Sequence, residues 1–559
     1  MKNARPKQVA QAKKSKADLS KTTFWTINWF ENRYFVYGCL AIVLLFVMLV
    51  RTRLLHLPLE RDEGEYALMG QLLLKGIPAY EMAYNMKLPG TYYMYALAMA
   101  IFGESLVGIH LGLLLVNLTS TLLLFFIGKK LVNTSTGLFA AVSFALLTLS
   151  PGVLGFAAHA THFIVLFGLL GLLSLLQYAE QPIWKRLTLS GFCFGLAFLM
   201  KQQAVFLLPF GLLALWLIEQ QRTPDGNKRT GFNLGLFTGA MVLPYMLVVM
   251  VALVTGSFDN FWHWTVEYAG QYVGIKTGAD AWRFLKLYFP LVFSGYELFW
   301  LIGTAGLVVL FFSQNPRKYR WLILAFAVCS VACVIPGYYF RLHYFIVFMP
   351  ALALLVGVTL NFLLEKWSPR QVFWGNFLPF LLFSCMIFLA IFKHGSTFFK
   401  DDMTRIVTRT YSSANPFAAS LEIARFIRAY SSEEDKIAIL GSEPQIYFYS
   451  DRLPATGYIY TYPLMENQAY SLEMQRDIIA EIEKAKPKFL IFVNSSLSWT
   501  RAENASNHIF DWYGAYKNNY HMVGLIDLNP SGKPTYVWRE AISGYKALNK
   551  EQVWVFERK

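Results

Sequence analysis

A succession of long apolar stretches, separated by short loops, dominates the sequence. Each stretch approaches the length at which a helix crosses a ~30 Å hydrocarbon core. Only 15% of the residues are charged, whereas an average soluble domain has about 25%. We therefore expect a polytopic α-helical membrane protein with about eleven transmembrane helices. The predicted spans lie near residues 35–50, 105–127, 135–152, 160–179, 187–200, 203–218, 231–255, 290–312, 321–338, 342–364 and 371–392.

Lys and Arg residues gather in the loops on one side of these stretches, which predicts that this side faces the cytoplasm. The turn around Ser150 and Gly152, on the other side, has neither. With a cytoplasmic N-terminus, an odd number of spans then predicts an extracytoplasmic C-terminal part, in what we expect to be a bacterial plasma membrane. If residues 187–218 formed one long helix instead of two short ones, the C-terminal part would be cytoplasmic. The basic pairs and triplets are Lys129 and Lys130, Lys185 and Arg186, Arg222 with Lys228 and Arg229, Arg317 with Lys318 and Arg320, and Lys366 with Arg370.

These loops also explain the net charge of +15. No basic region carries a nucleic-acid readout motif, so nucleic acid is not an expected partner. The five cysteines lie in apolar stretches without CxxC spacing, which predicts neither a disulfide framework nor a zinc site.

Three regions follow from this pattern. Residues 1–34 form a basic cytoplasmic tail, residues 35–393 the membrane domain, and residues 394–559 an extracytoplasmic α/β domain. In the last region, helical periodicity at 416–430 and 472–484 alternates with the strand-like runs KIAIL, KFLIFV, MVGLID and VWVF. The Tyr-rich run GSEPQIYFYSDRLPATGYIYTYPL is predicted to be a long loop with short strands.

Two outer loops, near residues 51–104 and 256–289, are long for a plain helical bundle, and loops of this length are usually functional. The second contains FDNFWHWTVEYAGQYVG, which is dense in aromatic residues. Two interpretations remain open. The rings could anchor the loop at the membrane interface, or they could form a stacking wall for a sugar or lipid.

The first outer loop carries adjacent carboxylates, Asp62 and Glu63, just beyond the first span. A structural interpretation is that Asp62 caps a helix, with Glu65 completing a capping box. The alternative is a catalytic role. Lys87 follows in the same loop, before the turn at Pro89, and a lone lysine there could simply be solvated.

Further polar residues are expected at the same outer level. His159 and His162 open the fourth span, and Arg341 and His343 open the tenth. Lys201 lies between two short apolar runs, where an unpaired charge is costly unless it lines a polar cavity. We therefore predict one outer cavity, with Tyr66 and Tyr92 as further candidates for its wall.

Cations beside a carboxylate favour a phosphate-bearing substrate and a general base. A lipid-phosphate sugar fits, because its leaving group is already a phosphate and needs no general acid. Cations can stabilise the charge that develops on it. No metal or other cofactor is then required. A divalent ion on Asp62 and Glu63 is an alternative that is not favoured.

The run RDEGEYALMGQLLLKG, followed by NMKLPGTYYMYAL, resembles the first outer loop of GT-C glycosyltransferases. The branch is that of dolichyl-phosphate-mannose protein mannosyltransferases and bacterial lipid A aminoarabinose transferases. The resemblance implies an integral membrane transferase that uses a polyprenyl-phosphate sugar on the outer face. The acceptor hydroxyl could belong to a lipid, a glycan or a protein.

By this resemblance, Asp62 is the catalytic carboxylate and Glu63 its motif partner. Lys87 and Lys201 match lysines that face the donor phosphate, and Arg341 fits loosely. The family often has a second acidic residue near the start of the fourth span. His159 and His162 stand there instead.

The predicted function is therefore inverting glycosyl transfer, with Asp62 as base and the phosphate held by Lys87, Lys201, Arg341 and His343. The alternative is a transporter or flippase for a lipid-linked anion. Such a protein should show internal repeats and charged or broken helices near mid-membrane. The sequence has no evident repeat, and its ionisable residues cluster at one face.

Overall fold

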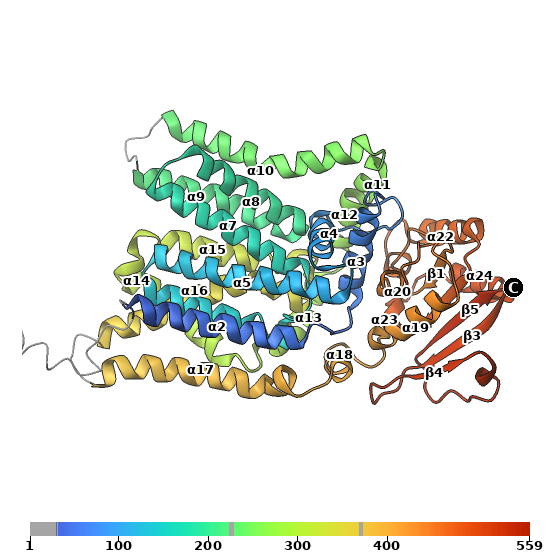
Figure 1. Cartoon of the computed structure of the whole chain (residues 1–559). Helices are drawn as coiled ribbons and strands as arrows, with labels where there is room; N and C mark the ends of the chain where they lie inside the picture. Colours follow the sequence, from blue (N-terminus) through green and yellow to red (C-terminus); the bar gives the residue numbers. More distant parts are fainter. Residues whose placement is uncertain (1–29, 31, 223–227, 368–372) are drawn as a thin grey trace, which may run out of the picture.

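In the computed structural model, a bundle of apolar helices carries a smaller α/β domain at one end (Figure 1). The structure describes residues 30, 32–222, 228–367 and 373–559. Most of the predicted basic tail, residues 1–34, lies outside these residues. The predicted fold class, a helical membrane protein with a C-terminal α/β domain, is confirmed.

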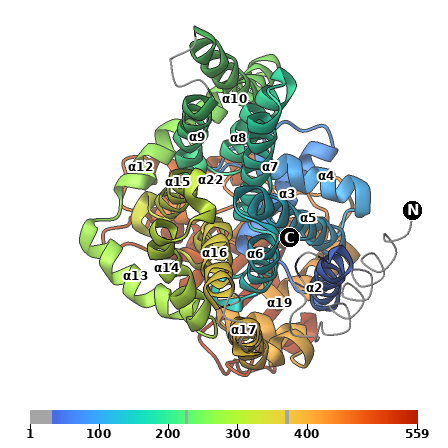
Figure 2. The same ribbon diagram turned by 90° about the vertical axis from the view of Figure 1, so that its left-hand side faces the viewer.

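Seven helices in the described part of the chain are long and apolar enough to cross a membrane. Three of them, α5, α7 and α16, are mostly buried inside the protein, whereas α2, α10 and α17 expose most of their surface. The end-on view shows this arrangement, with α7 and α16 inside and α2, α10 and α17 outside (Figure 2). The seven are α2 (Arg33–Arg53), α5 (Leu106–Leu131), α7 (Ala160–Glu180), η4 with α9 (Gln202–Arg222), α10 (Lys228–Val254), α16 (Met349–Trp367) and α17 (Phe373–Phe399).

All eleven predicted spans contain helix, but four do not hold a single helix of spanning length. Three have only a short helix: α6 (Thr134–Leu147), α8 (Trp184–Met200) and α15 (Arg320–Ala332). The stretch 290–312 is interrupted, because α13 (Gly278–Phe293) meets α14 (Glu297–Phe312) at a bend of 107°. Gly295 allows this bend by adopting a φ of +84°. Counted as one bent span, the pair gives eight.

The two short runs around Lys201 are separate antiparallel helices. Arg186, near the start of α8, donates to the Gln177 carbonyl at 2.9 Å. Arg222, at the end of α9 (Leu207–Arg222), donates to the neighbouring Tyr178 hydroxyl at 3.2 Å. Both termini therefore lie at the same end of the bundle, and Lys201 lies at the turn at the other end.

The C-terminal domain contains a five-stranded sheet of order β1-β2-β5-β3-β4. Strands β1 and β2 are parallel, with Ile437 opposite Phe489, and the other pairs are antiparallel. The four predicted strands and two predicted helices are confirmed, whereas β4 was missed. The short strands predicted for the Tyr-rich run 441–464 are wrong, because that run contains the short helices α20 and α21 and no strand. The strands are β1 (Ile437–Leu440), β2 (Phe489–Asn494), β3 (Tyr520–Asp527), β4 (Thr535–Trp538) and β5 (Gln552–Arg558); the helices are α18 (Met403–Tyr411), α19 (Phe417–Ala429), α20 (Gln445–Ser450), α21 (Tyr462–Met465), α22 (Ser471–Ala485), α23 (Ser496–Trp499) and α24 (His508–Tyr516).

The first outer loop lies between the bundle and this domain (Figure 1). It forms two helices, α3 (Arg61–Leu74) and α4 (Gly90–Phe102). The second outer loop forms α11 (Phe258–Trp262), a π-helical turn η5 (His263–Tyr268) and α12 (Ala269–Gly274). π-Helical turns are frequent at functional sites.

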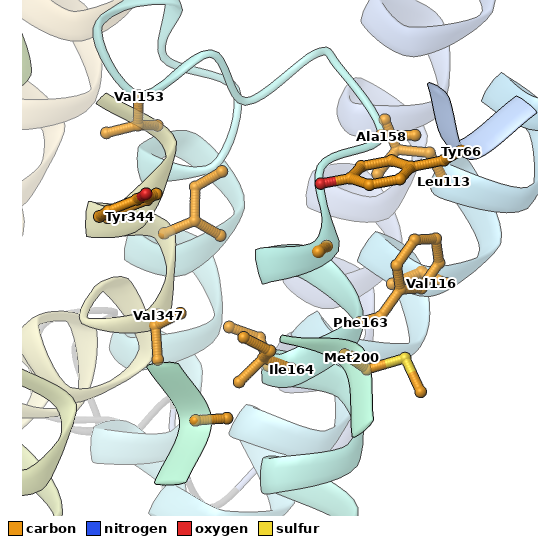
Figure 3. Packing of buried hydrophobic residues seen from close by; sticks show 14 of the residues in the cluster. Tyr66, Leu113, Val116, Val153, Ala158, Phe163, Ile164, Met200, Tyr344 and Val347 are labelled. Atoms are coloured by element: carbon orange, nitrogen blue, oxygen red, sulfur yellow. The ribbon is translucent and has the colours of Figure 1, made fainter. Parts of the chain in front are cut away.

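Buried hydrophobic residues from several helices pack together in the bundle (Figure 3). Ala158, Met200 and Tyr344 are among them. Each is adjacent in sequence to a predicted site residue, namely His159, Lys201 or His343. The backbone next to each of these site residues is therefore closely packed, which restricts the movement of the site residues.

We predict that the C-terminal domain is extracytoplasmic, because it lies at the end opposite the basic loops. A reporter that is active only outside the cytoplasm should work when fused after Lys559. The matched control is the same reporter fused after Lys130, which should be inactive there. The reverse pattern would contradict the predicted topology.

Candidate active site

Helix α3 begins with a capping box that orients the acidic motif. The cap is Glu60, whose Oε1 accepts a hydrogen bond from the backbone N–H of Glu63 at 2.9 Å. Glu63 Oε2 accepts in return from the N–H of Glu60 at 3.4 Å. The interpretation of Asp62 as the cap, with Glu65 completing the box, is therefore wrong. The cap is two residues earlier than predicted, so the side chain of Asp62 is available for other contacts.

Asp62 and Glu65 lie on one face of α3, because residues three apart are neighbours on a helix. Lys87 Nζ lies between them and donates to Asp62 Oδ1 at 3.1 Å and to Glu65 Oε2. Tyr92 donates its hydroxyl proton to Glu65 Oε1 at 2.9 Å. The ring of Tyr66 lies 4.7 Å from Lys87 Nζ. Tyr66 and Tyr92 therefore contact the ion pair without lining the cavity described below.

Glu63 is on a different face of α3 and does not line the cavity described below. Its Oε1 accepts from the backbone N–H of Ala158 at 2.6 Å and lies 3.2 Å from His110 Nε2. The side chain is fully buried. Glu63 thus fixes the chain immediately before His159.

A cavity of about 440 Å³ lies between the outer end of the bundle and the C-terminal domain. It brings together five of the predicted groups from distant parts of the sequence, together with Asp62. His162 does not line it and is buried in the first turn of α7. The predicted residues that line the cavity are Asp62, Lys87, His159, Lys201, Arg341 and His343.

Two of the cations in this wall form no salt bridge with a carboxylate in the described part of the chain. Lys201 Nζ lies 3.3 Å from His343 Nε2 and 4.5 Å from the centre of the Tyr344 ring. The Arg341 guanidinium lies 5.3 Å from the Tyr339 ring. Burial lowers the pKa of Lys201 to about 7. An anion bound beside it would favour its charged form.

The Asp62 carboxyl is held in its ionised form. Burial alone would raise its pKa, but nearby positive charge, above all on Lys87, holds that pKa well below its usual range. The pKa of Lys87 is raised, because Asp62 and Glu65 outweigh the effect of burial. The pair thus presents a carboxylate and an ammonium group at neutral pH.

Asp62, His159 and His343 lie close enough together to hold a metal ion, with one ligand atom from each within 4.8 Å of the others. The two imidazole rings are stacked, with centroids 4.0 Å apart. Burial lowers the pKa of His159 to about 4, so its ring is neutral, as a metal ligand must be. The amines of Lys87 and Lys201, however, already contact Asp62 and His343. A cation there would be repelled by both amines.

The C-terminal domain contributes cavity residues that sequence reasoning missed. Tyr460 donates its hydroxyl proton to Asp62 Oδ1 at 3.1 Å, and Glu466 accepts from the Tyr268 hydroxyl at 2.6 Å. Both belong to or follow the Tyr-rich run, but its sequence does not indicate which tyrosine reaches the site. Glu65 could have been found from its spacing of three residues from Asp62.

The aromatic second outer loop places some of its rings in the cavity wall and others on the surface. Trp264, Tyr268 and Tyr272 line the cavity. Trp262, by contrast, is 43% exposed on the outer surface. The aromatic wall of the site therefore comes mainly from η5 and α12.

Residues 87–248 match the profile of the dolichyl-phosphate-mannose-protein mannosyltransferase family. The structure is similar to that of ArnT from Cupriavidus metallidurans bound to undecaprenyl phosphate, with a TM-score of 0.58. The sequences are 15% identical, and the match covers 92% of this chain and 97% of that chain. This is the GT-C fold.

The GT-C fold is shared with the apo oligosaccharyltransferase of Archaeoglobus fulgidus, at a TM-score of 0.52 and 14% identity. That match covers 92% of this chain and 75% of the other. No curated protein matches the sequence. The family profile includes Lys87, His159 and Lys201 but not Asp62 or Arg341. The predicted resemblance and the multi-pass membrane architecture are thus confirmed.

We predict that Glu443→Gln destabilises the contact between α3 and the C-terminal domain. Arg61 Nη2 lies 2.6 Å from Glu443 Oε1, and the Glu443 side chain is fully buried. Loss of one partner from a buried pair costs about 3–5 kcal/mol. Thermal unfolding of the purified protein in detergent should show a lower Tm.

The control is Glu422→Gln, which breaks the exposed pair with Arg425 in α19. Exposed pairs contribute at most about 1 kcal/mol, so this variant should unfold close to the wild type. Equal Tm values for the two variants would contradict the role assigned to the buried pair.

Proposed function

We propose that this protein is a glycosyltransferase that moves a sugar from a polyprenyl-phosphate donor to an acceptor hydroxyl, with inversion, on the outer face of the membrane. The observation that carries the proposal is the cavity itself. It places an ionised carboxylate, Asp62, beside two cations, Lys201 and Arg341, that form no salt bridge with any carboxylate among the described residues. A base and an anion site are what this reaction needs from the protein.

The similar proteins support the same chemistry. The family profile is named for transfer from dolichyl-phosphate mannose to protein, and the ArnT crystal structure contains undecaprenyl phosphate. The donor sugar, a hexose or a pentose, and the acceptor, a lipid, a glycan or a protein, remain part of the proposal. The ionisable residues of the cavity all lie at one end of the bundle, which does not favour the transporter alternative.

In the proposed reaction, Lys201 and Arg341 bind the donor phosphodiester, and Lys87 adds positive charge behind them. The acceptor oxygen attacks the anomeric carbon on the face opposite the phosphate. The bond from that carbon to the phosphate oxygen breaks, and its electron pair leaves with the polyprenyl phosphate. Asp62 takes the acceptor proton.

No metal ion is required in this scheme. The positive charge that stabilises the departing phosphate comes from Lys201 and Arg341. His159, like His162, stands where the family often has an acidic residue, and the ring of His343 is stacked on that of His159. Burial lowers the pKa of His159 and of His343. We propose that they remain neutral and close the cavity beside Asp62.

We predict that Asp62→Asn reduces transfer by at least ~100-fold, because the amide cannot accept the proton. Asn keeps the size of the side chain, and the helix cap is Glu60, so α3 should form normally. The measurement is turnover with a polyprenyl-phosphate sugar and purified protein. Wild-type turnover would defeat the assignment of the base.

We also predict that donor affinity depends on Lys201 and on pH. Its pKa of about 7 means that the empty site loses this charge as the pH rises above 7. The donor phosphodiester keeps its charge over this range, so its affinity should fall about 10-fold between pH 6 and 9. This corresponds to the loss of one charge-assisted hydrogen bond.

Lys201→Arg is the informative variant for this prediction, because arginine stays charged throughout. Its donor affinity should be nearly independent of pH, whereas Lys201→Ala should bind weakly at every pH. Titration of the donor at several pH values measures all three proteins. The same pH dependence in the wild type and in Lys201→Arg would contradict the prediction.

A further inference from the structure

The C-terminal domain forms one side of the cavity rather than standing apart from it. Its cavity residues come from three separate segments of the domain, and they face the cationic wall built by the bundle. Figure 1 shows the domain against helix α3. The residues are Tyr411, Asn415, Phe417, Tyr460, Tyr462, Pro463, Glu466, Leu497 and Thr500.

One of these residues reaches the proposed base directly. Tyr460 donates its hydroxyl proton to Asp62 Oδ1 at 3.1 Å, and its ring lies 5.5 Å from Lys87 Nζ. Only 6% of the tyrosine is exposed. The contact joins residues 398 positions apart in sequence, so it exists only when the domain is docked.

The backbone that carries Tyr460 is fixed by its neighbours. The next residue, Thr461, donates its backbone N–H to Ser442 Oγ and its hydroxyl proton to the Ser498 carbonyl, both at 3.0 Å. All three of these residues are fully buried. The hydroxyl of Tyr460 is therefore presented from a rigid loop.

The facing helix is held equally firmly. Arg61, the residue before Asp62, forms the buried pair with Glu443. One turn on, Gly64 lies so close to α20 that a Cβ there would be 2.6 Å from the backbone nitrogen of Gln445. These contacts fix the position of α3 relative to the domain on both sides of Asp62.

The two donors share one oxygen of the carboxylate. Asp62 Oδ1 accepts from both Tyr460 and Lys87, whereas Oδ2 accepts no hydrogen bond within the described part of the chain. Oδ2 lies 3.9 Å from His343 Nε2, on the cavity side. Oδ1 of Asp62 is therefore held by two hydrogen bonds, whereas Oδ2 is available to a ligand in the cavity.

We propose that Tyr460 is a positioning residue through which the C-terminal domain completes the active site. Its hydroxyl anchors Oδ1 so that Oδ2 is the oxygen that takes the acceptor proton. This inference rests on the proposed function of Asp62 as base. It assigns the C-terminal domain a part in the chemical step rather than in donor binding, because the donor phosphate faces Lys201 and Arg341.

Tyr460→Phe tests the proposal, because it removes the hydroxyl and keeps the ring. We expect kcat to fall about 10-fold, as for the loss of one hydrogen bond to a charged group, while the KM for the donor stays within about twofold. A purely structural role would instead lower the Tm without this separation of kcat from KM.

The matched control is Tyr458→Phe. Tyr458 also donates to a carboxylate, Asp477 Oδ2, at 3.0 Å in the same domain, but it does not line the cavity. Its loss should affect Tm about as much as the loss of the Tyr460 hydroxyl and leave kcat unchanged. An equal fall of kcat in the two variants, or wild-type kcat in Tyr460→Phe, would overturn the proposal.

A second measurement requires no turnover. The infrared carboxylate band that disappears in Asp62→Asn should shift in Tyr460→Phe and stay in place in Tyr458→Phe. An unshifted band in Tyr460→Phe would show that the contact is absent and overturn the proposal. If the wild-type protein transfers no sugar, a shifted band in Tyr460→Phe would still show the contact. The proposed function would then be refuted, and the contact would have no role in catalysis.

Discussion

The buried lysine between two carboxylates is the interaction on which the outer end of this protein depends. Lys87 binds Asp62 and Glu65 of α3, and its backbone carbonyl accepts from the Tyr80 hydroxyl at 2.6 Å. A buried charge without partners would be strongly unfavourable. The ion pair therefore fixes the first outer loop against α3 and, at the same time, keeps Asp62 ionised.

The cavity contains cations in two electrostatic states. Lys87 is neutralised by its two carboxylates, whereas Lys201 and Arg341 face the open volume without one. The first state preserves the charge of a base. The second leaves Lys201 and Arg341 available to the anionic donor proposed above. The cation that pairs with the proposed base is therefore Lys87. The cations proposed to bind phosphate are different residues, Lys201 and Arg341.

Much of this arrangement could be predicted from the sequence, and the exceptions have physical causes. Apolar runs and basic loops predicted the bundle, and the cost of burying Lys201 indicated a polar cavity. The sequence did not show that Glu63 rather than Glu65 completes the capping box, because a two-residue shift of the helix start exchanges their positions in the box. Tyr460 had no signal at all, because its partner lies hundreds of residues away and only the docked domain brings them together.

The close contact of α3 with the C-terminal domain also limits how the cavity can exchange its contents. Lifting the domain would break the buried Arg61–Glu443 pair and the close contact of Gly64 with Gln445. With the domain docked, the lipid donor proposed above would have to enter the cavity from the side of the bundle.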